Sequence, residues 1–110
     1  MMQTFPNDEN GDVLRRMQAT GDHLDQPRDI DFNHVFQKEE EAQQFSDAIR
    51  RLGYEKVSYK FWEMKEVWDA CVVVFMVPSH AEITRIEQKF DAVAREFFGR
   101  ADGWGCIAVV

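Results

Sequence analysis

The chain has little cysteine, little proline and a shortage of basic side chains. Its two cysteines, Cys71 and Cys106, form no CxxC pair and have no histidine partner at metal-ligand spacing, which argues against a thiol-based metal site. Only 13 Lys and Arg side chains oppose 20 Asp and Glu side chains, so the formal net charge of the 110 residues is −7. Direct binding of nucleic-acid phosphates needs a basic face. We therefore expect no direct nucleic-acid ligand, and attraction to basic partners instead.

Long hydrophobic runs are also missing. The longest, over residues 70–78, has the length of a buried strand and is too short to cross a membrane as a helix. The first ten residues are polar and acidic, unlike a secretory signal, and we expect them to be flexible. Both cysteines lie in apolar segments and are most simply reduced thiols that pack as small hydrophobic side chains. We expect a cytoplasmic protein that needs no cofactor.

The spacing of apolar residues predicts three helices. The first runs from about residue 8 or 12 to residue 20, where Asn10-Gly11-Asp12 offers an N-cap and an acidic first turn. The second covers residues 38–52 and carries three glutamates in its first turn. The third and longest follows the capping box Ser79-His80-Ala81-Glu82 and ends at Gly99.

Alternation of apolar and polar residues predicts strands over residues 29–37 and 54–62. The segment 68–77 is apolar on both faces after Asp69, which is typical of a central strand covered on at least one side. A sharp turn at Gly103-Trp104-Gly105 should lead into a last strand, since glycine permits positive φ.

The order of these elements predicts an α+β fold of the ferredoxin-like βαββαβ type, an antiparallel sheet with two helices on one face plus an N-terminal helix. In that fold the first and third strands are central, so we expect 68–77 in the centre and the lysine-rich 54–62 at an edge. We expect residues 1–110 to form one domain. Within it, 11–28 would be an added helix and loop, whose position the sequence does not fix, and 29–110 the core.

Five groups of short motifs follow one another along the chain: Gly21-Asp22; Pro27-Arg28-Asp29 with Asp31-Phe32; Leu52-Gly53-Tyr54; Met76-Val77-Pro78 with Glu82-Ile83-Thr84; and Asp102-Gly103-Trp104-Gly105. Any one of them is weak, but their order and spacing together resemble the RraB family, the bacterial regulators of ribonuclease activity B. The resemblance covers about residues 13–106.

The resemblance implies a ferredoxin-like domain that is not an enzyme and that inhibits ribonuclease E. It implies binding to the endonuclease itself, at its arginine-rich, non-catalytic C-terminal part, and slower RNA decay, with RNA not a direct ligand. Longer members of the family continue into a strongly acidic tail, whereas the acidic residues here lie mostly before Asp31 and over 39–41. The alternative is an interaction module of the same fold with a different bacterial partner, or with a homodimer role. An enzyme ranks last, because the sequence offers no nucleophile–base pair, phosphate loop or metal cluster. The oligomeric state is left open.

Two kinds of residue are candidates for partner binding. Asp29 and Asp31 are two apart on a strand and share a face, so with Asp102 they could form an acidic patch for a basic partner. The alternative, which we favour because strand faces of antiparallel sheets are commonly wet, is a solvated face with a salt bridge to Arg28 or another arginine.

The tryptophans form the second group. Trp104 could be an exposed anchor, as tryptophan is enriched in binding hot spots, or could pack under the helix that begins at Ser79. We favour packing because of the area that a tryptophan buries. Trp62 and Trp68 flank a charged connection, so we expect both to be partly exposed.

Overall fold

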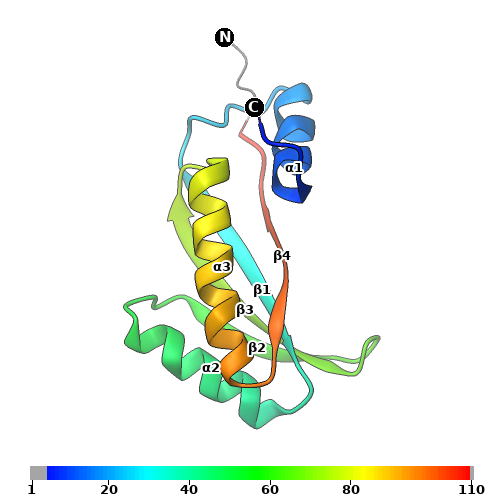
Figure 1. Cartoon of the computed structure of the whole chain (residues 1–110), viewed down its shortest axis with the longest axis vertical. Coiled ribbons are helices and arrows are strands. Elements are labelled where there is room, and N and C mark those ends of the chain that lie inside the picture. Colours follow the sequence, from blue (N-terminus) through cyan, green and yellow to red (C-terminus); the bar gives the residue numbers. More distant parts are fainter. Residues whose placement is uncertain (1–4, 110) are drawn as a thin grey trace.

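The computed structural model describes residues 5–109 and shows three helices and a four-stranded antiparallel sheet, an α+β architecture (Figure 1). The number and order of the elements agree with the sequence patterns. Of the segment 1–10, residues 1–4 lie outside the described residues, and residues 9 and 10 already belong to the first helix. The elements are α1 (Glu9–Ala19), β1 (Arg28–Phe36), α2 (Glu39–Arg51), β2 (Val57–Trp62), β3 (Val67–Met76), α3 (His80–Glu96) and β4 (Arg100–Cys106).

The strand order in the sheet is β2-β3-β1-β4, and all neighbouring strands are antiparallel. The expected central place of the third strand and edge place of the second are therefore confirmed. A central strand is shielded by a neighbour on each side, which suits the apolar composition of β3, whereas an edge strand such as β2 tolerates lysines.

Helices α2 and α3 pack on one face of the sheet, which we call the covered face (Figure 1). His34 shows this directly, because its buried ring contacts Phe45 of α2 and Phe90 of α3 at centroid distances of 4.6 and 6.0 Å. Phe90 also meets Phe32 edge-to-face at 5.6 Å. Aromatic pairs of this kind add to the stabilisation from buried area. The buried apolar side chains of this layer are Ile30, Phe32, Phe36, Ala42, Phe45, Ile49, Val57, Ala70, Val72, Ile83, Ile86, Phe90 and Ala94.

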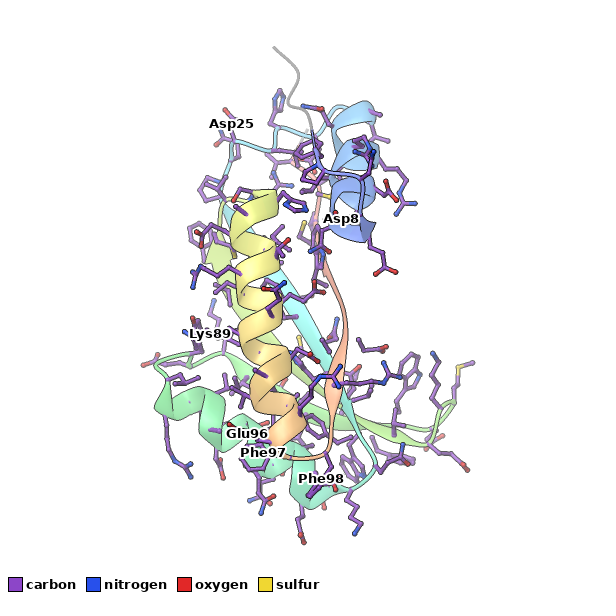
Figure 2. The ribbon with its side chains drawn as sticks, viewed as in Figure 1. Asp8, Asp25, Lys89, Glu96, Phe97 and Phe98 are labelled. Atoms are coloured by element: carbon purple, nitrogen blue, oxygen red, sulfur yellow. The ribbon has the colours of Figure 1, made fainter. Side chains whose placement is uncertain are left out.

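The structure places α1, which the sequence left unplaced, beside α3 and the end of β4. Its N-cap is Asp8, whose side chain accepts a hydrogen bond from the Gly11 N–H. Of the two expected starts, the one near residue 8 is therefore confirmed, and the cap offered at Asn10 is wrong. Figure 2 shows Asp8 between the first turns of α1 and α3, and its carboxylate lies 2.8 Å from Nε2 of His80. Asn10, free of a capping role, instead donates to Oγ1 of Thr84 and Oε1 of Glu87, each over 3.1 Å.

The segment Gly103-Trp104-Gly105 differs from its prediction. It is part of β4 and not a turn before it. The strand is bulged at this point, since two of its residues, Asp102 and Gly103, lie opposite the single Asn33 of β1. At this bulge Gly103 has φ of 99°, a conformation that glycine adopts without strain. The apolar residues 107–109 follow the strand without joining the sheet, and Val110 lies outside the described residues.

Candidate functional site

None of the helices described within residues 5–109 covers the second face of the sheet, which we call the open face. Residues paired across an antiparallel ladder point to the same side, so the register assigns each side chain to a face. In the part of the chain that the structure describes, none of the open-face side chains is fully buried. The open-face positions are Asp29, Asp31, Asn33 and Val35 of β1; Ser58, Lys60 and Trp62 of β2; Val67, Asp69, Cys71, Val73 and Phe75 of β3; and Arg100 and Asp102 of β4.

Four carboxylates from three strands share the open face: Asp29, Asp31, Asp69 and Asp102. Burial raises the pKa of Asp69, and the nearby charge of Asp102 raises it further, while Lys60 partly offsets both. Asp69 of β3 and Asp102 of β4 therefore repel each other electrostatically across β1. A cation placed over this region would relieve that repulsion.

The aspartates expected to bind a basic partner are thus brought to one face. Asp29 and Asp31 are exposed there, with Oδ1 of Asp29 4.0 Å from Nζ of Lys56. Asp102 is exposed at the β4 edge, and its Oδ1 lies 3.6 Å from an Nη of Arg100. The suggested bridge to Arg28 is not formed, because the guanidinium of Arg28 pairs with Asp22 on the far side of the strand.

The three tryptophans are divided between the two faces. Trp62 is half-buried at the hairpin end of the open face, with Nζ of Lys65 5.0 Å from its ring centroid. Trp68 pairs with Phe36 and lies on the side of the covered face, half-buried against Tyr59 and Phe61. The expectation that Trp62 and Trp68 are partly exposed is confirmed.

Trp104 pairs with Phe32 and therefore also points to the covered face. It is half-buried against the core, and its indole N–H donates to Oδ1 of Asn10 over 2.8 Å. The favoured interpretation of Trp104 as a packing residue agrees with this position, although α1 supplies the hydrogen bond and not α3.

Sequence reasoning missed Asp69, Val73 and Phe75 as members of the open face. The signal of Val73 and Phe75 was present in the apolar run of β3, which continues on both sides of the strand. Only one layer of helices covers the sheet, so half of that run had to remain uncovered. Phe75 is 69% exposed as a result.

A groove of about 550 Å³ runs between α3, the edge strand β4 and the start of α1. Asp91 lies in it and accepts hydrogen bonds of 2.7 Å from Nε of Arg95 and from the Ala101 N–H. Burial raises the pKa of Asp91, but these two donors lower it by more, so the net shift is downward. The Asp91 contact also occupies a backbone donor of β4 that an edge strand would otherwise leave free.

The thiol of Cys71 lies on the open face in surroundings that oppose its ionisation. Burial, with the charges of Asp31 and Asp69, raises the pKa of Cys71 to about 11, so this thiol is protonated at neutral pH and is a poor nucleophile. Among residues 5–109, no three His, Cys, Asp or Glu side chains are grouped so as to hold a metal ion. None of the described helices is long and apolar enough to cross a membrane.

Comparison with known protein families identifies one that covers nearly the whole chain. The family model with the description "Regulator of ribonuclease activity B", RraB, matches residues 7–106, nearly the whole chain. No curated protein matches the chain. The matched range includes all of the open face and all three tryptophans.

Proposed function

The chain belongs to the RraB family, and from this we propose that it is a non-enzymatic regulatory protein that binds ribonuclease E and modulates RNA decay in the cytoplasm. The family match over residues 7–106 carries this proposal. The contact would be between proteins, with a basic surface of the endonuclease as the partner and with no direct RNA ligand.

The charge of the molecule supports a basic partner. A net charge of −7 attracts cationic surfaces at long range. We propose that Asp29, Asp31 and Asp102 on the open face meet the partner, with Trp62 at the end of that face. The exposed edges of Trp68 and Trp104 on the other face are secondary candidates.

The test is direct binding of purified ribonuclease E to the purified protein over a range of salt concentrations. Affinity should fall as salt rises, because the attraction between exposed charges is screened. The triple variant D29N/D31N/D102N should bind more weakly than the wild type.

A control separates a local effect from the loss of net charge. The triple variant Glu39→Gln, Glu40→Gln and Glu63→Gln removes three exposed charges elsewhere on the surface and should bind almost normally. Absence of any complex between the folded wild-type protein and ribonuclease E at low salt would refute the proposed function.

The second candidate function is an interaction module with a different bacterial partner, or a homodimer. Its specific support is the exposed apolar side chains Phe61, Met64 and Phe75, which are 46, 90 and 69% exposed. Analytical ultracentrifugation distinguishes a homodimer from a monomer, and a monomer that does not bind ribonuclease E would favour another partner.

We also infer a ferredoxin-like classification. Its support is the order strand, helix, strand, strand, helix, strand after α1, together with β1 and β3 in the centre of the sheet. In this view residues 11–28 are an addition to a core formed by residues 29–110.

A further inference from the structure

Strand β3 has the composition of a strand buried on both faces, yet only one of its faces is covered. Every residue from Ala70 to Met76 is apolar. Ala70 and Val72 are fully buried under the helices, whereas Cys71, Val73 and Phe75 point to the open face. Antiparallel sheets with one wet face normally alternate between apolar and polar residues. The open side of β3 is therefore an apolar row that no described element of the chain covers.

An acidic row runs beside this apolar row. In the register of β1 against β3, Asp29 pairs with Phe75 and Asp31 pairs with Val73. Side chains of paired residues lie about 5 Å apart, so a ligand on Phe75 or Val73 is within reach of a carboxylate. Both aspartates are exposed, and among residues 5–109 the one ion pair of this row is the long contact of 4.0 Å between Oδ1 of Asp29 and Nζ of Lys56.

We propose that the open face is the docking surface for a cationic, partly apolar segment of the protein partner. Arginine side chains of the segment pair with Asp29 and Asp31, and its apolar side chains cover Val73 and Phe75. The identity of the partner as ribonuclease E rests on the proposed function, while the chemistry of the segment follows from this face.

Arginine fits this surface better than lysine does. Its planar guanidinium can bind a carboxylate through two hydrogen bonds, and its aliphatic stem can lie on apolar side chains. A second copy of the chain is disfavoured as the occupant, because it would bring a further net charge of −7 to a face that already carries four carboxylates. Addition of a strand at the β4 edge is opposed by Asp91, which already accepts from the Ala101 N–H.

The experiment uses a defined probe, a synthetic peptide of arginine and leucine in equal numbers. Binding to the full chain is measured by isothermal titration calorimetry at one low ionic strength. We expect Phe75→Ser, and separately D29N/D31N, to weaken binding about tenfold, the effect of losing a central anchor or charge contact. Peptides with lysine for arginine, or serine for leucine, should also bind more weakly.

Two matched controls keep this result specific. Met64→Ser removes an apolar side chain that is 90% exposed at the hairpin tip, and E39Q/E40Q removes two exposed charges on α2. Both control variants should change the affinity by less than about twofold, since none of the three altered side chains lies on the open face. Equal losses in the control and open-face variants would overturn the proposal, because they would show that binding does not depend on the open face. A wild-type dimer that dissociates on Phe75→Ser would also overturn it, by making a second copy the cover.

Parallel titrations with ribonuclease E separate this inference from the proposed function. Peptide binding that depends on Phe75, with no binding of ribonuclease E, would leave the docking surface standing and reject the regulator function. Binding of ribonuclease E that is unchanged by Phe75→Ser and by D29N/D31N would reject the docking surface and leave the regulator function supported. Thermal unfolding of Phe75→Ser checks that the variant is folded, as expected for so exposed a side chain.

Discussion

The carboxylate of Asp22 accepts a hydrogen bond of 2.8 Å from the guanidinium of Arg28, and both side chains are buried. The other oxygen of Asp22 accepts from the Val109 N–H over 3.1 Å, and Arg28 also donates to the carbonyls of His23 and Ile107. This one ion pair joins the loop between α1 and β1 to the segment that follows β4. Asp22 and Arg28 stand in two of the motifs on which the resemblance to the RraB family rests.

Removal of one partner should be costly. Asp22→Asn leaves the guanidinium of Arg28 buried without its counter-charge, and we expect a loss of about 3–5 kcal/mol in the free energy of unfolding. The matched control is Asp47→Asn, which breaks the exposed pair with Arg50 and should cost less than about 1 kcal/mol. Urea unfolding at neutral pH measures both, and similar losses in the two variants would contradict a buried pair.

The stabilisation from the ion pair of Asp22 and Arg28 should be lost in acid. Burial raises the pKa of Asp22, but the hydrogen bonds from Arg28 and Val109 lower it by more, so its pKa in the folded protein is below 3.8. A lowered carboxyl pKa stabilises the fold above the unfolded-state value, and the stabilisation is lost as pH falls through the folded-state value. The difference in unfolding free energy between wild type and Asp22→Asn should therefore be constant above about pH 5 and shrink below pH 3.8. A difference that stays unchanged in acid would contradict this assignment.

Asn10 and Trp104 should be coupled energetically. Asn10→Ala removes the acceptor of the indole N–H of Trp104 and also the amide donor to Thr84 and Glu87. We expect a loss of about 1–3 kcal/mol, at roughly 1 kcal/mol for each hydrogen bond. In a Trp104→Phe background the same change should cost less, because the indole donor is already gone. A double-mutant cycle from urea unfolding gives the coupling, and strictly additive losses would show that the hydrogen bond contributes nothing.

The sequence predicts the elements of this fold because their signals are local. Alternation along residues 29–36 marks β1, and the apolar run of β3 marks a central strand. The position of α1 depends instead on the hydrogen bond that Asn10 donates to Thr84 and the one that it accepts from Trp104, and these partners are 74 and 94 residues away. No periodicity records contacts between residues so far apart in the chain.

The candidate site was predictable in part for the same reason. The shared face of Asp29 and Asp31 follows from the two-residue repeat of a strand. The addition of Asp69 and Phe75 to that face depends on the register between β1 and β3, and the exposure of Phe75 depends on which face the helices leave open. Trp104 illustrates the limit, since the bulge at Gly103 determines the direction of its side chain.

His34 should make the protein sensitive to mild acid. Burial lowers the pKa of His34 from 6.5 to about 4, and Nδ1, 3.3 Å from the Ala70 carbonyl, donates to it in the neutral ring. Between pH 6.5 and about 4 the unfolded chain binds a proton that the folded protein does not, so stability falls as pH falls. The total loss is about 3 kcal/mol at roughly 1.4 kcal/mol per pH unit. His34→Phe, which cannot titrate, should show a flatter curve of unfolding free energy against pH, and parallel curves would refute the assignment.

The two glycines that flank Trp104 should respond oppositely to alanine. Gly103 has φ of 99°, a conformation that alanine adopts only with strain, so Gly103→Ala should lower the free energy of unfolding by about 1–2 kcal/mol. Gly105 is not among the described glycines with positive φ, and a Cβ built there meets no atom within 4 Å. Gly105→Ala should therefore stabilise the protein by about 0.4–1 kcal/mol, because it restricts the unfolded chain without straining the folded one. Midpoints of urea unfolding compare the stability of the two variants. If Gly105→Ala lowered the free energy of unfolding as much as Gly103→Ala does, the bulge would not be the reason for a glycine in this segment.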